Sequence, residues 1–258
     1  MNNFDPYDAL VPIFRKTTIP KGTKQIASSV FIKNDMGYFL FTAAHVTDDL
    51  NIGKLLIPVD GNLYEIHGYL AHIDLPPEIK RSEDDIDFAY FKLSTPFAKE
   101  LIRTFKPITG NHCDIITSSL SLKVCSVAGY PASKSNKKNN IHSSEIFAFT
   151  GVAALQETYQ SLELSHSSNI VLHFDRKKAV DPENGKPFPT PGLKGVSGGG
   201  IFSWPDKLER MPPDWSERKL IGIFHTYKER EGLVIGTTLI PFLSGLTLGH
   251  MKNFGGYF

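Results

Sequence analysis

The sequence predicts an all-β protein, and three features lead to this prediction. Short apolar segments recur along the whole chain, turn-forming residues separate them, and helical segments are brief. The helices fall only near the N-terminus, in the middle and near the C-terminus. Many short strands with little helix are typical of β-barrels or β-sandwiches. The 258 residues suffice for one domain or two and for a substantial core.

The first half of the chain begins with a short helix or turn over residues 6–15. Two apolar runs then flank the turn sequence Asn34–Gly37, which predicts a β-hairpin. A helix is predicted at Thr95–Ile102, where an N-cap threonine precedes a proline at the first helical position. The predicted strands are Gln25–Lys33, Tyr38–Ala44, Lys54–Val59, Leu63–Ile73 and Asp87–Leu93.

The second half repeats the pattern of short strands, and we place the boundary between residues 1–112 and 113–258. Polar or Pro-rich loops are predicted at Ser133–Asn140, Asp175–Lys194 and Ser203–Lys219, and a short helix at Phe242–Lys252. The predicted strands are Leu122–Gly129, Glu145–Ala153, Ile170–Phe174, Gly200–Phe202, Leu220–Thr226 and Leu233–Ile240.

Composition argues against several classes of partner and location. The formal net charge is +1, so no overall field favours nucleic acid or an anionic membrane. Cys113 and Cys125 are the only cysteines and cannot form a disulfide framework. Met1–Leu10 carries no secretory pattern, and no apolar run reaches membrane-spanning length. These features predict a cytoplasmic protein.

Three polar residues stand in settings that suit chemistry. Ser197 lies in the glycine-rich stretch Gly195–Gly200, His45 ends an apolar run, and Asp87 precedes another. Asp84 and Asp85, beside Asp87, are expected to be more exposed. Taken singly, the three are also explained as a loop serine, a core histidine and an acidic turn.

Together, the three side-chain types are those that acyl transfer requires. A serine hydroxyl needs a neighbouring base, and imidazole titrates near neutral pH. A buried carboxylate fixes the imidazole tautomer. The backbone N–H groups of Gly195 and Ser197 would hold the developing oxyanion.

These residues lie in segments that resemble the three motifs of the trypsin-like (chymotrypsin-fold) serine peptidases. The segments are Thr42-Ala43-Ala44-His45, Asp87-Phe88-Ala89-Tyr90 and Gly195-Val196-Ser197-Gly198-Gly199, in the family's order. Val127–Pro131 and Leu220–Phe224 also resemble its second-barrel strands. The resemblance implies two antiparallel six-stranded β-barrels, with His45 and Asp87 on the first and Ser197 on the second. It implies an active site in the cleft between them.

The sequence departs from the secreted members of that family at two points. Val196 precedes the serine where secreted members have an aspartate, which pairs with a new N-terminal amine after zymogen cleavage. The family's disulfides are also absent. Both departures fit the non-secreted branch of the family. The ordering of the oxyanion turn must then come from elsewhere, from a partner, substrate or ligand.

The resemblance also implies a specificity pocket. No carboxylate stands at its base, which falls at Pro191, so a preference for Lys or Arg is not predicted. His225 and Thr226 could hydrogen-bond a polar or acidic substrate side chain, with a register uncertain by one residue. The residues implied are Pro191, Gly192, Leu193, His225, Thr226, Tyr227 and Gly236.

The sequence therefore predicts an intracellular serine endopeptidase that acts through an acyl-enzyme and needs no metal or cofactor. Its predicted partners are a protein or peptide substrate and an activating protein partner, with neither nucleic acid nor membrane. One alternative is a protease-like module that binds a peptide or partner without turnover. Another is a peptidase that is latent until activated, because loop Asp175–Lys194 resembles that of trypsin-like proteins in bacterial, including antiviral, defence systems.

Overall fold

The computed structural model describes most of the chain, in nine segments: residues 4–18, 21–48, 50, 52–72, 75–138, 141–180, 186–205, 215–248 and 256–257. Parts of five predicted elements fall outside these residues. They are residue 73 of the strand Leu63–Ile73, residues 139–140 of the loop Ser133–Asn140, residues 181–185 of the loop Asp175–Lys194, residues 206–214 of the loop Ser203–Lys219, and residues 249–252 of the predicted terminal helix.

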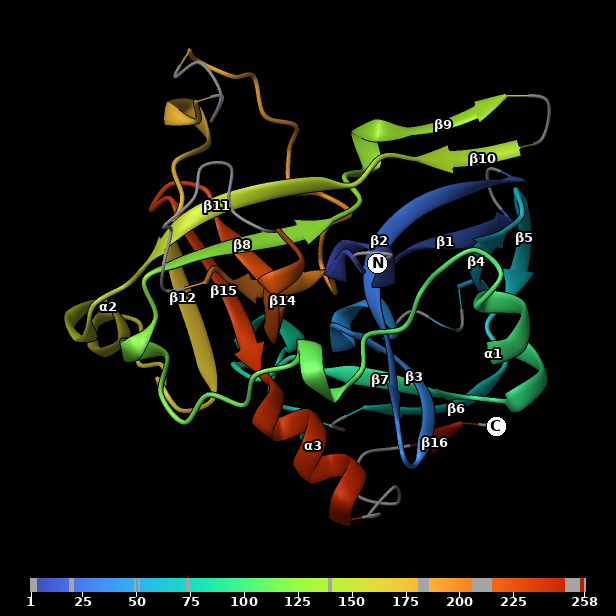
Figure 1. Cartoon of the computed structure of the whole chain (residues 1–258), viewed down its shortest axis with the longest axis horizontal. Helices are drawn as coiled ribbons and strands as arrows, with labels where there is room; N and C mark the ends of the chain where they lie inside the picture. The colour runs from blue at the N-terminus through green and yellow to red at the C-terminus, as the bar shows by residue number, and fades with distance from the viewer. Residues whose placement is uncertain are drawn as a thin grey trace.

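The N-terminal half forms an antiparallel sheet of eight strands in the order β16-β6-β7-β3-β2-β1-β4-β5 (Figure 1). The short helix η1 (Pro6–Ala9) precedes it, and helix α1 (Thr95–Leu101) packs its apolar face onto the same core. The strands are β1 Leu10–Thr18, β2 Lys21–Asn34, β3 Gly37–Thr42, β4 Leu55–Val59, β5 Asn62–Glu65, β6 Gly68–His72, β7 Ala89–Leu93 and β16 Gly256–Tyr257.

The C-terminal half forms a closed antiparallel barrel of six strands in the order β11-β12-β15-β14-β13-β8. Its interior holds aliphatic and aromatic side chains from every strand, Cys125, Phe149, Leu172, Ile201, Ile221 and Val234 among them. The strands are β8 Val124–Gly129, β11 Phe147–Ala153, β12 Asn169–His173, β13 Gly200–Ser203, β14 Lys219–Lys228 and β15 Leu233–Thr238.

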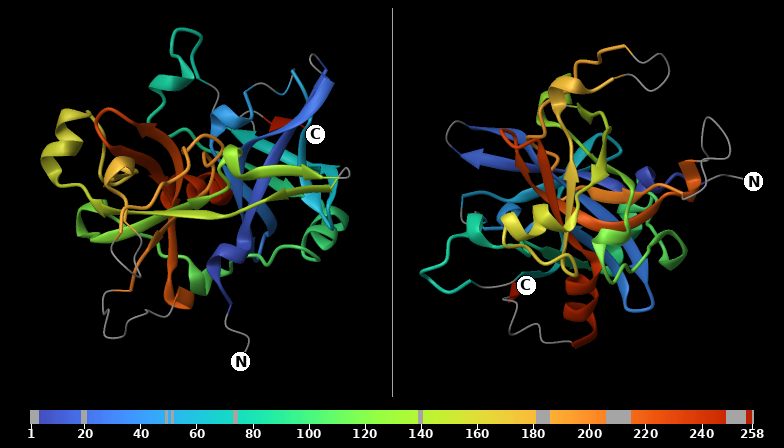
Figure 2. Two further views of the ribbon diagram at one scale, coloured as in Figure 1. Left: turned by 90° about the horizontal axis from the view of Figure 1, so that it is seen from above. Right: turned by 90° about the vertical axis from the view of Figure 1, so that its left-hand side faces the viewer.

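A shared core joins the two halves, which lie side by side in Figures 1 and 2. Side chains alternate across β3, so Leu40 enters the core of the N-terminal sheet while Phe39 and Phe41 enter the shared core. Phe41 stacks on Phe242 of helix α3 (Leu239–Leu248), with ring centroids 4.6 Å apart. Because the interface is apolar and continuous, the halves hold a fixed orientation.

The predicted fold class is confirmed: strands dominate, two barrel-like sets form, and short helices occupy the predicted positions. The N-terminal sheet has eight strands rather than the six expected, and one of the additional strands is β16 from the end of the chain, which pairs with β6. The boundary after residue 112 stays a prediction.

Several elements differ from the sequence predictions. Only Pro6–Ala9 of the predicted helix or turn at residues 6–15 is helical, and the rest belongs to strand β1, which pairs with β2. The predicted strand Leu63–Ile73 is divided between β5 and β6. The loop Ser133–Asn140 contains strand β9 (Ser135–Lys138), which pairs with β10 (Ile141–Ser144). This hairpin lacks an apolar face, so hydrophobic patterning does not reveal it. Helix α2 (Gln156–Ser161) was not predicted, and α3 begins before Phe242. No helix among the described segments is long and apolar enough to cross a membrane.

Candidate active site

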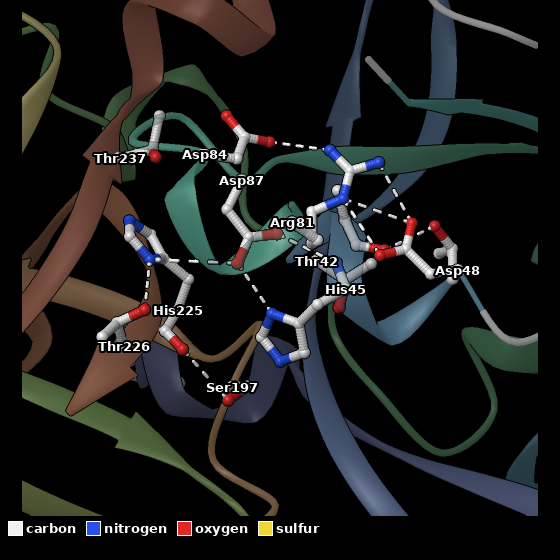
Figure 3. Close-up of polar contacts among 12 residues, drawn as sticks. Thr42, His45, Asp48, Arg81, Asp84, Asp87, Ser197, His225, Thr226 and Thr237 are labelled. Atoms are coloured by element: carbon white, nitrogen blue, oxygen red, sulfur yellow. Dashed lines mark hydrogen bonds and ion pairs between the residues drawn. The ribbon is translucent and has the colours of Figure 1, made fainter. Parts of the chain in front are cut away.

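His45 and Asp87 are brought together by two neighbouring strands. His45 lies in the 3-10 turn η2 (Ala44–Val46) directly after β3, and Asp87 lies just before β7, which pairs with β3. The His45 Nδ1 and Asp87 Oδ2 atoms are 2.7 Å apart (Figure 3). The His45 backbone N–H also donates to Asp87 Oδ1 at 2.9 Å. The carboxylate thus fixes both the imidazole and the backbone that carries it.

The two side chains differ in exposure in the way that proton transfer requires. The Asp87 side chain is only 5% exposed, whereas that of His45 is 38% exposed. Asp87 has φ +35°, a conformation that asparagine and aspartate tolerate better than most residues. A buried carboxylate on Nδ1 leaves Nε2 as the nitrogen that faces incoming chemistry.

The loop that carries Asp87 is anchored to the loop that follows His45. Arg81, in the turn η3 (Arg81–Glu83), donates to Asp84 at 2.7 Å and to Asp48 at 3.0 Å. The Asp84 side chain is only 6% exposed in this network, so it is nearly as buried as that of Asp87 rather than clearly more exposed. Asp85 is exposed, as expected. Arg81 therefore fixes the distance between the two chain segments that present the histidine and the aspartate (Figure 3).

The same loop is also attached to the C-terminal barrel. Thr237 Oγ1 on β15 donates to the carbonyl oxygen of Ile86, and Asn169 Nδ2 on β12 donates to that of Asp85. Both donors are buried. Asp87 is therefore positioned by both halves of the molecule, although its strand belongs to the first.

Ser197 comes from the C-terminal half, on the turn that leads into β13. Its Oγ donates to the carbonyl oxygen of His225 at 3.3 Å. Among the described residues it makes no hydrogen bond to His45. In the view of Figure 3 the His45 imidazole is drawn between Asp87 and Ser197.

Val196 occupies the position where secreted relatives of the resembled family have an aspartate. Its side chain is fully buried in the core of the C-terminal barrel, together with Leu193 and Ile201. An apolar side chain at this point stabilises the turn by burial. The turn therefore needs polar contacts from another element to fix its backbone.

Those contacts come from Ser28 on β2 of the N-terminal half. Ser28 Oγ donates to the carbonyl oxygen of Gly195 at 2.9 Å and accepts from the N–H of Tyr130 at 2.8 Å. The Ser28 backbone N–H donates to the carbonyl oxygen of Ser197 at 2.8 Å. Ser28 is completely buried, so these bonds are shielded from water. One residue thus holds both ends of the segment Gly195–Ser197.

The glycines of the turn answer two steric demands. Gly195 and Gly198 have φ +91° and +84°, conformations that glycine adopts without strain. A Cβ at Gly198 would also lie 2.1 Å from the Ser28 carbonyl oxygen and 2.2 Å from Thr42 Oγ1. The close approach of the two halves therefore requires glycine at position 198.

The turn presents two unpaired donors beside the serine. Within the described part of the chain, the N–H groups of Gly195 and Ser197 have no hydrogen-bond acceptor. The intervening N–H of Val196 donates to the carbonyl oxygen of Leu193 at 3.0 Å. Two open N–H groups around one serine form an arrangement that can bind an oxyanion.

A second histidine, His225 on β14, lies against the same carboxylate. Its Nδ1 is 2.9 Å from Thr226 Oγ1 and 3.9 Å from Asp87 Oδ2. Burial lowers the pKa of His225 to about 4, and the nearby Asp87 only partly offsets this. The ring is therefore neutral at pH 7. The sequence predicts that the His225 side chain contacts substrate; in the structure His225 lines the pocket beside Ser197, while its Nδ1 lies near Asp87 and Thr226 (Figure 3).

A pocket of about 350 Å³ opens beside Ser197. Of the seven residues implied for the specificity pocket, Gly192, Leu193, His225 and Tyr227 line it and Pro191, Thr226 and Gly236 do not. Gly236 lies in the barrel wall instead, where a Cβ would meet Ile201 and Ile223. The remaining lining residues are Arg176, Lys194, Phe224 and Glu229.

The four lining residues that the sequence analysis missed fall into two groups. Lys194 and Phe224 adjoin predicted site residues, so adjacency in the chain could have identified them. Arg176 and Glu229 lie on separate turns, and only the folded chain brings them to the pocket. Elsewhere, a larger cavity of about 660 Å³ on the C-terminal barrel includes none of His45, Asp87 and Ser197. Within the described segments no three His, Cys, Asp or Glu side chains gather as metal ligands.

Comparisons with known proteins agree with this architecture. No protein-family model and no curated protein matches the sequence. Among solved structures, the VesB protease of Vibrio cholerae is similar, with a TM-score of 0.50 and 14% identity over 93% of this chain. The alignment spans 64% of the VesB chain. The serine protease domain of the Sesbania mosaic virus polyprotein has a TM-score of 0.49 and 14% identity, covering 93% of this chain and 92% of that domain.

The strand order, the closed second barrel and the likeness to VesB define the class of fold. The chain has the two-barrel, chymotrypsin-like fold, with His45, Asp87 and Ser197 gathered where its halves meet.

Proposed function

We propose that this protein is a serine endopeptidase in which Ser197 is the nucleophile, His45 the general base and acid, and Asp87 the orienting carboxylate. One observation carries the proposal. The His45–Asp87 pair, joined at 2.7 Å, lies beside a serine whose turn offers two N–H groups without acceptors. A pocket of about 350 Å³ next to that serine gives room for a substrate side chain.

The proposed reaction begins with attack of Ser197 Oγ on the carbonyl carbon of the scissile peptide. His45 Nε2 takes the hydroxyl proton, and the N–H groups of Gly195 and Ser197 hold the oxyanion. The C–N bond then breaks, and His45 returns the proton to the departing amine. Water next attacks the serine ester with His45 as base, which releases the carboxylic acid product and restores Ser197. No step requires a metal or cofactor.

Asp87 and His225 have different parts in this reaction. Asp87 accepts the hydrogen bond from His45 Nδ1 and stabilises the imidazolium that forms on His45. His225 lies on the far side of the carboxylate and is neutral at pH 7, because burial lowers its pKa to about 4. A neutral ring there does not compete with His45 as a cation. The bond from Ser197 to the His225 carbonyl would give way to a Ser197–His45 bond in the substrate complex, since such bonds often tighten on binding.

Labelling with a fluorophosphonate probe tests the proposal directly. The wild-type protein should be labelled at Ser197, and Ser197→Ala should abolish labelling. Ser161→Ala, an exposed serine on α2, is the matched control and should label as the wild type does. Labelling that persists in Ser197→Ala would refute the assignment of the nucleophile.

A binding module without turnover is the alternative, and one observation favours it. Ser197 Oγ is bonded to a backbone carbonyl rather than to His45. If this were its permanent state, the serine would lack a base. Absence of labelling in the wild-type protein, together with tight binding of a peptide, would support this alternative against the peptidase.

We also propose that the protein acts inside the cell, and that a protein partner controls it. Cys113 and Cys125 are both free, and burial raises their thiol pKa values to about 11 and 12. Free thiols agree with a reducing compartment. The resemblance of loop Asp175–Lys194 to that of bacterial defence proteins suggests a protease that a signal activates. Measuring peptide hydrolysis with and without candidate partners separates a latent enzyme from a constitutive one.

A further inference from the structure

We propose that the pocket beside Ser197 accepts an acidic side chain, and that Arg176 is the residue that recognises it. The acidic residue would be the one whose carbonyl group is cleaved. This inference rests on the proposed peptidase function and names the substrate class of the same site. It depends on the position, exposure and charge of Arg176 relative to its neighbours.

The Arg176 side chain forms part of the pocket wall. Arg176 lies in the short turn η7 (Arg176–Lys178), after the end of β12. A Cβ built on Gly192 would lie 3.2 Å from its Nη1 atom, so the guanidinium rests against the Gly192 backbone. Glycine at this position leaves the space that the guanidinium uses. The charged group thereby faces the pocket beside the proposed nucleophile.

The charge of the pocket is set mainly by cations. Arg176 and Lys194 are the cationic residues of its lining, and Glu229 is the one carboxylate among the described lining residues. The Arg176 side chain is 35% exposed, whereas that of Glu229 is 64% exposed. The guanidinium is thus the more deeply set of the two charges, and the field inside the pocket follows it.

The ion pair between Arg176 and Glu229 is one that a substrate can replace. The two side chains are 3.4 Å apart, Nη2 to Oε1, and an exposed pair of this kind contributes little to stability. A substrate carboxylate would reach the guanidinium in a more shielded place than Glu229 does. Arginine binds carboxylates through two parallel hydrogen bonds, which makes it selective for that group.

Other substrate side chains fit the pocket less well. Leu193 and Phe224 in its lining are apolar and provide no partner for an ammonium or guanidinium group. A lysine or arginine side chain would meet the like charge of Arg176, and such repulsion contributes to selectivity. Recognition of a basic side chain by Glu229 is the opposing hypothesis, and the same experiment decides between them.

Matched fluorogenic peptides test the inference, with Glu, Gln, Asp, Asn or Lys at the cleaved residue. The wild-type protein should cleave the Glu and Asp peptides at least ~10-fold better, in kcat/KM, than their amides. Arg176→Gln should lower kcat/KM for the acidic peptides by ~30-fold and leave the Gln and Asn peptides nearly unchanged. Arg176→Lys should retain part of the preference. Glu229→Gln should improve cleavage of the acidic peptides, because it removes the competing carboxylate.

Lys178→Gln is the matched control, because Lys178 lies on the same turn and its side chain is 84% exposed. It removes the same charge outside this pocket and should leave the preference unchanged. Fluorophosphonate labelling of each variant reports folding and nucleophile independently of the pocket. Normal labelling with equal cleavage of Glu and Gln peptides, or with preferred cleavage of Lys, would overturn the inference but leave the peptidase intact. Absence of labelling in the wild-type protein, both alone and with candidate partner proteins added, would overturn both.

Discussion

The two sides of the candidate site are held in different ways. On the N-terminal side, His45 and Asp87 are joined directly by side-chain and backbone hydrogen bonds of 2.7 and 2.9 Å. On the C-terminal side, Ser197 makes a bond of 3.3 Å to the His225 carbonyl, and its turn is fixed through the backbone by Ser28. The His45–Asp87 pair is thus complete in itself, whereas Ser197, the proposed nucleophile, is positioned by contacts from the opposite half.

This difference shows which part of the site is fixed by strand pairing and which part by the packing of the two halves. Neighbouring antiparallel strands fix the His45–Asp87 pair, so it follows from the register of β3 and β7. The serine turn depends on the fit between the halves, through Ser28 and the close approach at Gly198. Any change in the packing of the halves should therefore affect Ser197 and the open N–H groups of its turn before it affects the His45–Asp87 pair.

Replacing the buried carboxylate of Asp87 should have the largest effect on activity. It removes the partner of His45 on the N-terminal side and leaves the Ser197 turn unchanged. Asp87→Asn should lower kcat for peptide hydrolysis by ~10⁴-fold, since an amide favours the wrong tautomer of His45. Hydrolysis of a fluorogenic peptide measures the effect. Asp85→Asn, two residues earlier and exposed, is the control and should remain within ~2-fold of the wild type. Equal losses in the two variants would contradict the role of Asp87.

Adding one carbon atom to the turn that carries Ser197 should displace the C-terminal side of the site. Gly198→Ala places a Cβ 2.1 Å from the Ser28 carbonyl oxygen at a position with φ +84°. The halves must separate locally, so we expect a loss of at least ~100-fold in labelling rate, as for a displaced oxyanion donor. The midpoint temperature of thermal unfolding should fall as well. Gly110→Ala is the control, because a Cβ there meets no atom within 4 Å. Wild-type labelling by Gly198→Ala would show that the turn tolerates such a shift.

The dependence of the free energy of unfolding on pH should show that His225, which lies against Asp87, is kept neutral in the folded protein. Burial lowers the folded-state pKa of His225 to about 4, whereas an unfolded histidine titrates near ~6.5. As the pH falls from 7 toward 4, His225 becomes protonated in the unfolded chain but stays neutral in the folded protein. The free energy of unfolding therefore decreases. The loss reaches about 3 kcal/mol at most.

Urea unfolding of the wild type and His225→Asn between pH 7.5 and 4.5 measures this loss. The variant should show a shallower decline, because asparagine does not titrate. His173→Asn, at an exposed position on β12, should decline as steeply as the wild type does. Parallel profiles for the wild type and His225→Asn would show that the ring is not kept neutral by burial.

Sequence reasoning identified the residue types of the site better than its supports. His45, Asp87 and Ser197 were visible because each has a short local pattern, and the all-β class followed from strand and turn signals. Ser28 was not visible, since a serine in a strand gives no sign that its hydroxyl will meet Gly195 from the other half. Arg176 and Glu229 were missed for the same reason. Such contacts are fixed by tertiary packing, which no local pattern encodes.

Removing the Ser28 hydroxyl should have the smallest effect of these changes, and it tests whether this group positions the turn that carries Ser197. Ser28→Ala leaves the Gly195 carbonyl without its donor and the Tyr130 N–H without its acceptor. The free energy of unfolding should fall by ~2 kcal/mol, as expected for buried polar groups left unpaired. A turn that is less firmly held should also lower kcat by ~10-fold with little change in KM, because the oxyanion donors act mainly in the transition state.

Ser29→Ala separates the positioning role of Ser28 from a merely structural one. Ser29 is equally buried on the same strand, but its Oγ donates to the Val11 carbonyl, away from the turn. It should lower stability by a comparable ~1–2 kcal/mol and leave kcat unchanged. If the two variants lose kcat to the same extent, the activity follows overall stability, and Ser28 does not position Ser197 specifically. If Ser28→Ala alone loses kcat, the C-terminal side of the site is positioned from the N-terminal half by one hydroxyl group.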